Sequence, residues 1–180
     1  MWQEICGDYR AYGRPLVAQG FWAIAFHRYG TSINRIQNRF LRLPFRMVHW
    51  MLIKFSEIFF GIYIGPNARI GSRCVIEHFG AIIIHSEATI GNDVRIRQGV
   101  TIGNKSAQEP NDVPVIGNNV DIGAGAKILG KIVVGDGVAV GANAVVIRDV
   151  PPNCLAVGVP ARVVPRRTDA ATDAVRLGMH

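Results

Sequence analysis

The sequence has few cysteines, and they follow no pattern that would form a framework. Its 180 residues include only Cys6, Cys74 and Cys154, which are widely spaced and not arranged as Cys-x-x-Cys. This usage excludes a disulfide-stapled scaffold and a cysteine zinc site, and it indicates a reducing compartment. The N-terminus also lacks a basic segment followed by an apolar one. We therefore predict no secretory signal. We expect a cytoplasmic protein, either free or located at the inner face of the membrane.

Acidic residues are absent from Arg10 to Lys54, a stretch that contains eight Lys and Arg side chains. The net charge of +7 is therefore unevenly distributed along the chain. A segment of this kind attracts anions, such as a membrane surface or a phosphorylated substrate. A solvated basic face with no specific partner explains the charge equally well.

Long uninterrupted hydrophobic runs are missing as well. Residues 43–65 are the most apolar stretch, but Arg46, His49, Lys54 and Glu57 interrupt them, so a membrane-spanning helix is not predicted. The mixture of basic and aromatic residues suits a helix that lies on a membrane surface. The favoured alternative is a helix face that packs on the rest of the protein or on a neighbouring subunit.

Residues 1–60 are predicted to form a small α-helical N-terminal region. Apolar residues between Leu16 and Phe26 recur at helical spacing. Gly30 followed by Thr31 predicts that one helix ends there and a second one begins.

After residue 61 the spacing of the aliphatic residues changes to six. This period is typical of a parallel β-helix, whose coils hydrogen bond about 4.8 Å apart. We therefore predict a β-helix domain over residues 61–165 and a C-terminal tail over 166–180. The aliphatic positions of the repeat are Ile64, Ile70, Ile76, Ile82, Ile84, Ile90, Ile96, Ile102, Ile116, Ile122, Ile128, Val134, Val140 and Val146.

Two irregularities interrupt the repeat. The run Ile82-Ile83-Ile84 shifts the register by two residues, which predicts a bulge. Residues 104–114 are polar and contain two prolines, so they are predicted to form an extruded loop of the kind that often borders a site. Cys74 occupies a small inward position of the repeat, where a core role is expected and a nucleophile is not.

Four motifs resemble the hexapeptide-repeat acyltransferases, and the whole chain resembles their serine acetyltransferase branch. The motifs are Glu77-His78, residues 99–103 (GVTIG), residues 122–130 (IGAGAKILG) and residues 158–162 (GVPAR). The resemblance implies a left-handed parallel β-helix with three hexapeptides per coil. It also implies a homotrimer with active sites between subunits, and acetyl-CoA as co-substrate without a metal.

The resemblance further assigns His78 as the general base. A neutral imidazole removes a hydroxyl proton as the new bond forms, which contributes on the order of 100- to 10,000-fold. Glu77 is a candidate for orienting a substrate or tuning the site, or else it is a plain corner residue. His85 is either a helper from the next coil or, as favoured, a turn residue. The candidates for CoA binding are Gly103, Asn104, Lys105, Ala124, Ala142 and, for the phosphates, Lys127, Arg148, Arg162, Arg166 and Arg167.

Three positions depart from the serine acetyltransferase pattern. Tyr63 stands where that family has an Asp supporting the base, Val113 stands where it has a second functional His, and no acidic equivalent is clear near Asp8. The chain also resembles the acetyltransferases of exopolysaccharide (colanic-acid-type) biosynthesis in residues 59–61 (Phe-Phe-Gly) and 96–97 (Ile-Arg). We therefore expect a hydroxyl of a sugar or polysaccharide precursor as the acceptor. The alternatives are L-serine as acceptor, or a non-catalytic trimeric scaffold.

Two other functions fit the sequence poorly. A γ-type carbonic anhydrase needs three histidine ligands around its metal, and the repeats contain only His78 and His85. Nucleic-acid binding is not predicted, because the repeats have no aromatic platform and no reading motif.

Overall fold

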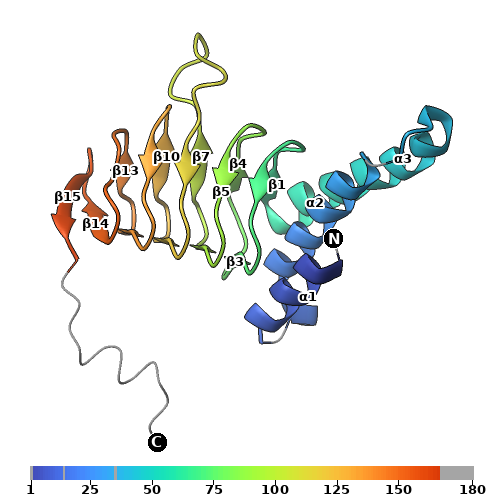
Figure 1. The fold of residues 1–180 in the computed structure, drawn as a ribbon, viewed down its shortest axis with the longest axis horizontal. Coiled ribbons are helices and arrows are strands. Elements are labelled where there is room, and N and C mark those ends of the chain that lie inside the picture. Colours follow the sequence, from blue (N-terminus) through green and yellow to red (C-terminus); the bar gives the residue numbers. More distant parts are fainter. Residues whose placement is uncertain (1, 14, 35, 167–180) are drawn as a thin grey trace, which may run out of the picture.

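The computed structural model describes residues 2–13, 15–34 and 36–166. Helices gather at one end, and the rest of the described chain winds into a column of coils (Figure 1). The predicted fold, a parallel β-helix preceded by a few helices, is confirmed. The helical elements are α1 (Trp2–Ala11), η1 (Pro15–Val17), α2 (Gln19–Ile33), α3 (Arg39–Phe55) and the π-helical turn η2 (Ser56–Phe60).

Strands of the column form three sheets, each of which takes one strand from every complete coil. The first sheet contains β1 (Ile62–Ile64), β4 (Ile82–Ile84), β7 (Thr101–Gly103), β10 (Lys127–Leu129) and β13 (Val145–Val146). The second contains β2 (Arg69–Ile70), β5 (Thr89–Ile90), β8 (Val115–Ile116) and β11 (Val133–Val134). The third contains β3 (Val75–Ile76), β6 (Arg95–Ile96), β9 (Asp121–Ile122), β12 (Ala139–Val140), β14 (Cys154–Val157) and β15 (Arg162–Pro165). All pairs are parallel except β14 with β15, which closes the far end as an antiparallel pair.

The six-residue repeat fills the inside of the column. Every aliphatic position of the repeat is buried except Ile70, which is partly buried against the same core. Cys74 is 1% exposed, as expected for a core residue, and burial raises the pKa of its thiol to about 12. Each fully buried Ile or Val side chain contributes about 1.5–3 kcal/mol, so the repeat is the main source of stability in this part of the chain.

The predicted bulge at Ile82-Ile83-Ile84 is wrong. All three residues form β4 and pair in register with β1. Eight positions lead from Ile76 to Ile84, whereas six lead from Ile96 to Ile102, the residues with which these two pair. The two additional residues therefore lengthen the corner between β3 and β4, where Gly80 adopts a positive φ of 107°.

The predicted helix end at Gly30 is also wrong, because α2 continues to Ile33. Gly30 is buried where α2 meets α3, and a Cβ atom there would lie 2.1 Å from Nε2 of His49. The hydroxyls of Thr31 and Ser32 bond to backbone carbonyls three residues earlier, so both fit inside the helix. Gly30 thus serves close packing between two helices and not chain reversal.

The helices cap the open edge of the first coil. An unpaired strand edge leaves its N–H and C=O groups free to pair with other chains. The Tyr12 hydroxyl accepts a hydrogen bond of 2.7 Å from the N–H of Ile76, and the Ser56 hydroxyl donates one of 3.0 Å to the carbonyl of Ile62. These bonds satisfy edge groups that a preceding coil would satisfy elsewhere in the column.

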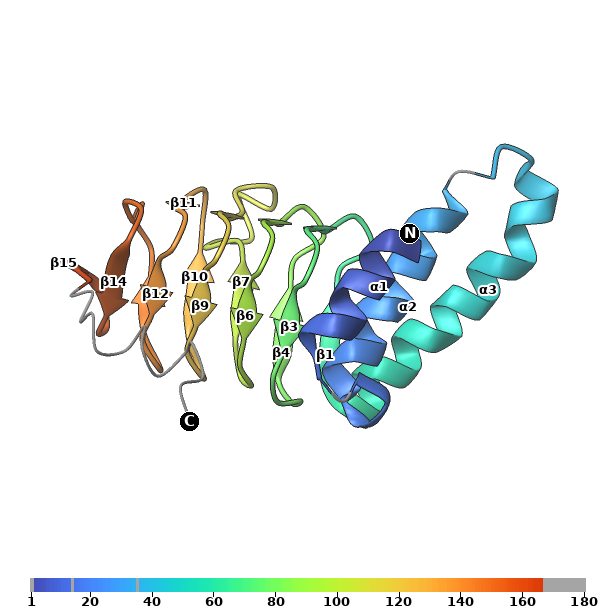
Figure 2. The same cartoon turned by 60° about the horizontal axis from the view of Figure 1, so that its bottom comes forward.

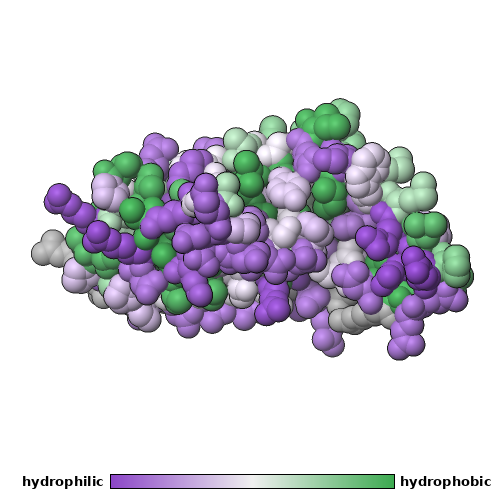
Figure 3. All heavy atoms as spheres, turned by 90° about the horizontal axis from the view of Figure 1, so that it is seen from above, coloured by the Kyte–Doolittle hydropathy of each residue, from purple (hydrophilic) through white to green (hydrophobic). Residues whose placement is uncertain are grey.

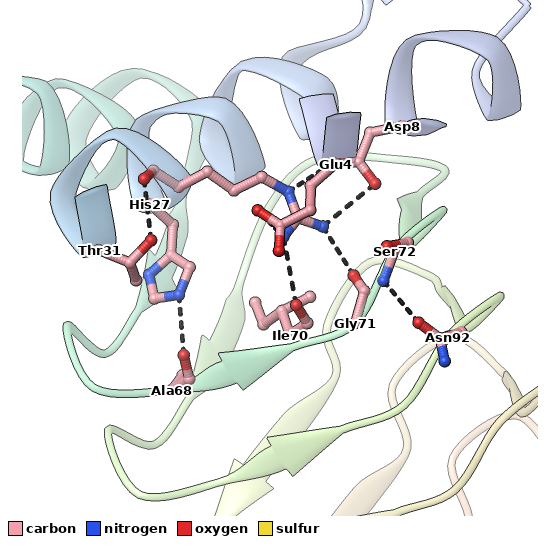
Figure 4. A network of polar contacts seen from close by, with 10 residues as sticks. Glu4, Asp8, His27, Thr31, Ala68, Ile70, Gly71, Ser72 and Asn92 are labelled. Carbon is pink, nitrogen blue, oxygen red and sulfur yellow. Dashed lines mark hydrogen bonds and ion pairs between the residues drawn. The ribbon is translucent and has the colours of Figure 1, made fainter. Parts of the chain in front are cut away.

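Polar contacts of Arg28 and His27 complete this cap. Figure 4 shows how Asp8 and His27 of the helices lie over Ala68, Ile70 and Gly71 of the first coil. The Arg28 guanidinium donates to the carbonyls of Ile70 (3.2 Å) and Gly71 (2.6 Å), and it forms an ion pair of 2.5 Å with Asp8 of α1. Nε2 of His27 donates to the carbonyl of Ala68 at 2.9 Å. Arg28 and Asp8 are 4% and 1% exposed, so this polar cluster belongs to the interior.

Residues 104–114 connect β7 to β8 and project from the side of the column (Figure 1). Among the described helices, none is both long enough and apolar enough to cross a membrane. The predicted tail of residues 166–180 lies outside the described residues apart from Arg166.

Candidate active site

The lengthened corner between β3 and β4 carries His78. Its side chain is exposed, and among the described residues it has no hydrogen-bond partner. Phe79, the next residue, is 53% exposed. A general base has to reach a substrate from the surface, and the longer corner presents this imidazole to solvent.

Glu77, directly before His78, is held by two arginines of the next coil. Its carboxylate lies 3.0 Å from Nη1 of Arg95 and 2.9 Å from Nε of Arg97. Arg97 also pairs at 2.5 Å with Asp121 one coil further on, and this hydrogen bond raises the pKa of the guanidinium. The chain of charges fixes the backbone position from which His78 projects.

Two alanines occupy the same corner as His78 on later coils of the column. Counted from β3, β6, β9 and β12, His78 corresponds to Gln98, Ala124 and Ala142, and the two additional residues of its corner bring Gly80 beside Gln98, with the N–H of Gly99 donating to the Gly80 carbonyl. The carbonyl of Gln98 accepts from Gly125 N–H, and that of Ala124 accepts from Asn143 N–H, both at 2.8 Å. At about 4.8 Å per coil, Ala124 lies about 10 Å and Ala142 about 14 Å from His78 along the axis. Beyond the longer, exposed Gln98, the two alanines therefore leave a strip with short side chains on the later coils.

The outer face of the first sheet borders this strip. Lys127 on this face donates to the carbonyl of Gly99 at 2.5 Å and to the Thr101 hydroxyl at 3.1 Å, so its ammonium is held at the His78 edge. The residues in register on this face are Tyr63, Ile83, Thr101, Lys127 and Val145.

Gly103, Asn104 and Lys105 lie at the other edge of the first sheet. Gly103 ends β7, and the Asn104 amide donates to the carbonyl of Ser106 at 2.7 Å. The Lys105 side chain runs beside Gly130, the residue after β10. A three-residue strand spans about 10 Å, so one chain does not bring these groups next to His78.

The candidate phosphate-binding arginines lie toward the far end of the column. Arg162 begins β15, Arg148 is exposed after β13, and Arg166 donates to the carbonyl of Gly137 at 3.2 Å. Arg167 lies outside the described residues.

His85 lies at the end of β4 opposite to the His78 corner. Its Nδ1 accepts a hydrogen bond of 3.1 Å from the backbone N–H of Glu87, as a turn residue would. Val113 is buried, and the buried Asp8 carboxylate forms an ion pair with Arg28, so neither side chain can contact a substrate. Tyr63 is half-buried on the outer face of β1. In the described part of the chain, no three His, Cys, Asp or Glu side chains converge on a common point that could hold a metal.

Sequence reasoning missed the arginines that hold Glu77. The usable signal was the register, because Glu77 and Arg97 follow the paired residues Ile76 and Ile96 and so occupy equivalent positions of successive coils. Opposite charges one coil apart on the outside of a parallel β-helix pair with each other.

Known proteins with similar sequence and structure are serine acetyltransferases. That of Synechococcus elongatus is 39% identical over 147 residues, which are 82% of this chain and 57% of the relative. The chain therefore spans little more than half the length of this curated relative. The soybean serine acetyltransferase complexed with serine has a TM-score of 0.78 at 35% identity, covering 90% of this chain and 68% of that one. The Brucella abortus serine acetyltransferase in complex with coenzyme A has a TM-score of 0.80 at 31% identity, covering 92% and 68%.

No protein-family model matches the chain. The similar proteins overturn the expected sugar or polysaccharide acceptor, because they are serine acetyltransferases and not exopolysaccharide acetyltransferases. They favour the alternative reading with L-serine. From the hexapeptide column and these matches, the chain belongs to the serine acetyltransferase family of hexapeptide-repeat acyltransferases.

Proposed function

We propose that the chain is an acetyl-CoA-dependent serine O-acetyltransferase in which His78 is the general base. The observation that carries the proposal is the exposed imidazole on a lengthened corner, with the small side chains of Ala124 and Ala142 at the same corner of later coils. Family membership supplies the acceptor and the acyl donor, since the relatives include complexes with serine and with coenzyme A.

The reaction needs one proton acceptor and no covalent enzyme intermediate. His78 takes the proton of the serine hydroxyl while the hydroxyl oxygen attacks the thioester carbonyl. The tetrahedral intermediate collapses, the carbon–sulfur bond breaks, and the imidazolium returns its proton to the CoA sulfur. The products are O-acetylserine and free CoA, so atoms and charge balance. The ion pairs of Glu77 with Arg95 and Arg97 fix the residue directly before His78, and the exposed imidazole makes both proton transfers.

The co-substrate lies along the column in this proposal. Ala124 and Ala142 leave room for the pantetheine arm, and their own backbone groups are already paired with neighbouring coils. The Lys127 ammonium is held at the same edge of the first sheet by Gly99 and Thr101. Gly103, Asn104, Lys105 and Arg162 complete the set of proposed CoA contacts.

A homotrimer would bring together proposed site residues that lie far apart within one chain. His78 and Gly103–Lys105 lie at opposite edges of the first sheet and do not meet within one chain. Cyclic packing of the columns would set one edge of the first subunit beside the other edge of the second. Exposed aliphatic residues on the outer faces of the strands, Ile83, Val115 and Val133, are suited to such contacts. We therefore place the active sites between subunits.

The test is CoA release from acetyl-CoA by purified protein with and without L-serine. For His78→Ala we expect kcat/KM to fall on the order of 100- to 10,000-fold, because the general base is lost. Arg73→Ala is the control, since Arg73 is on another corner and pairs only with Asp93. Light scattering coupled to size exclusion measures the assembly, with a trimer mass expected.

Three results would contradict the proposal. One is CoA release that does not depend on serine. Another is a His78→Ala variant that keeps more than a tenth of the wild-type rate. The third is binding of acetyl-CoA without turnover of serine, which would identify a different acceptor.

A further inference from the structure

Helix α3 carries no residue that the rest of the chain buries. One side faces α2, where His49 packs against Gly30 and Tyr29. The other side points away from the coils and from α1 (Figure 2). In the described part of the chain nothing covers this outer side.

The uncovered side of α3 is hydrophobic. Phe40, Met47 and Met51 are 81%, 63% and 64% exposed, and at helical spacing they follow one line that we name the outer stripe. Further exposed apolar residues flank the stripe on both sides: Leu41, Leu43, Phe45, Val48, Trp50 and Phe55. Figure 3 shows hydrophobic surface at this end of the molecule, beside hydrophilic side chains.

The charge of α3 has one sign. Its 17 residues include Arg39, Arg42, Arg46 and Lys54 and no Asp or Glu. Lys54 pairs with Glu57 in the following turn, whereas none of the three arginines forms an ion pair with a described residue. At helical spacing the exposed Arg39 and Arg46 border the apolar side next to Trp50, whereas the half-buried Arg42 lies beside His49 on the side that faces α2. Arg39 and Arg46 are thus placed to meet anions from outside.

We propose that α3 docks on the anionic headgroup region of a phospholipid bilayer. A helix with Trp, Phe and Leu on one side and Arg or Lys beside them lies in the membrane plane, with its apolar face about 5–10 Å deep. Each Lys or Arg near an anionic leaflet adds about 1 kcal/mol of attraction. The outer stripe enters the acyl boundary, and Arg39 and Arg46, at one edge of the apolar side, reach the lipid phosphates.

Two features favour a lipid surface over a second copy of this helix. Two copies of α3 packed along the outer stripe would leave Arg39 and Arg46 at the rim of the contact without a partner, because the helix has no Asp or Glu to pair with them. The apolar surface extends from Leu43 and Trp50 across the outer stripe to Leu41 and Val48. That arc is wider than the two-position seam that a paired helix covers, and it fits a broad flat partner.

The experiment is co-sedimentation of the full chain with vesicles. Vesicles of phosphatidylcholine alone are compared with vesicles that also contain phosphatidylglycerol, at low and high salt. We expect binding to the anionic vesicles only, and weaker binding at high salt because the charge attraction is screened. Arg39→Glu/Arg46→Glu is expected to weaken binding about tenfold or more. The matched control is Arg69→Glu/Lys131→Glu, which makes the same change of charge on the coils and is expected to bind like wild type.

A second variant tests the apolar contact. Phe40→Gln/Met47→Gln/Met51→Gln changes only exposed side chains, and we expect it to abolish binding without a change in the mass of the assembly. In wild type, the emission of Trp50, isolated as the difference from Trp50→Phe, is expected to shift to the blue with anionic vesicles. The proposal is overturned if wild type stays in solution, or if the triple variant binds like wild type. A triple variant with a smaller assembly mass overturns it in favour of a second copy.

Discussion

Replacement of Arg28 by Met tests whether a buried charge stabilises the packing of the helices on the first coil. The substitution keeps most of the length of the side chain and removes the guanidinium. It leaves the Asp8 carboxylate, 1% exposed, without its cation. It also takes the donor from the carbonyls of Ile70 and Gly71.

The expected loss is large because the pair is buried. Removing one partner of a buried ion pair costs about 3–5 kcal/mol, which corresponds to about 100- to 5,000-fold in the unfolding equilibrium. Urea denaturation measures this free energy, and hydrogen exchange locates it. We expect the exchange of α1, α2 and the first coil to rise far more than that of the last coils.

An exposed pair of similar geometry provides the control. Arg73 contacts Asp93 with two bonds of 2.6 Å, but the two side chains are 52% and 35% exposed. Arg73→Met should therefore cost far less than Arg28→Met, because solvent screens this exposed pair. Combining Arg28→Met with Asp8→Leu should recover part of the loss, because no charge is left buried. Equal costs for Arg28→Met and Arg73→Met would refute the reasoning.

Three further outcomes are expected. Burial lowers the pKa of His27 to about 4, so the stability it contributes is complete above about pH 6.5 and is lost as the pH falls toward 4, by about 3 kcal/mol in total. His27→Gln should flatten that part of the stability curve measured by urea denaturation, and an unchanged slope would contradict the assignment. Gly30→Ala should lower the melting temperature because its Cβ would meet the His49 ring, and adding His49→Ala should restore it. Ile96→Ala, at a fully buried position of the repeat, should cost about 2–5 kcal/mol in chemical denaturation, and a cost below 1 kcal/mol would contradict its place in the core.

The core was predictable because its signal is periodic and local. A six-residue spacing places each aliphatic side chain on the inside of every flat segment, whatever the neighbouring coils contain. Positions as far apart as Ile64 and Val146 therefore followed from spacing alone, and both are buried. His78 was found through its motif, and its exposure agrees with the proposed role, which awaits the measurements above.

The errors came from residues whose role depends on distant parts of the chain. Glycine is typical of a helix end, but Gly30 lies within α2. It is needed there because the ring of His49, nineteen positions later, packs too close for a Cβ atom. The run of three isoleucines suggested a slip in the strand, whereas pairing with β1 keeps them in register and moves the additional residues into the corner. Neither contact leaves a trace in the local pattern.

The sequence by itself determined the coil, its core and the family motifs, because these depend on repeated short-range spacing. Only the tertiary structure decided how the helices cap the first coil and how Glu77, the residue before the candidate base, is fixed. Arg28 reaches across 42 positions to Ile70, and Arg97 joins Glu77 to Asp121 across three coils. Such contacts depend on which charged groups the fold brings within about 3 Å, and the sequence offers many pairs of opposite charge. The sequence also could not show that the outer side of α3 is exposed. An apolar helix of this kind could be a core helix or a docking surface, and only the lack of a packed neighbour in the described chain separates the two.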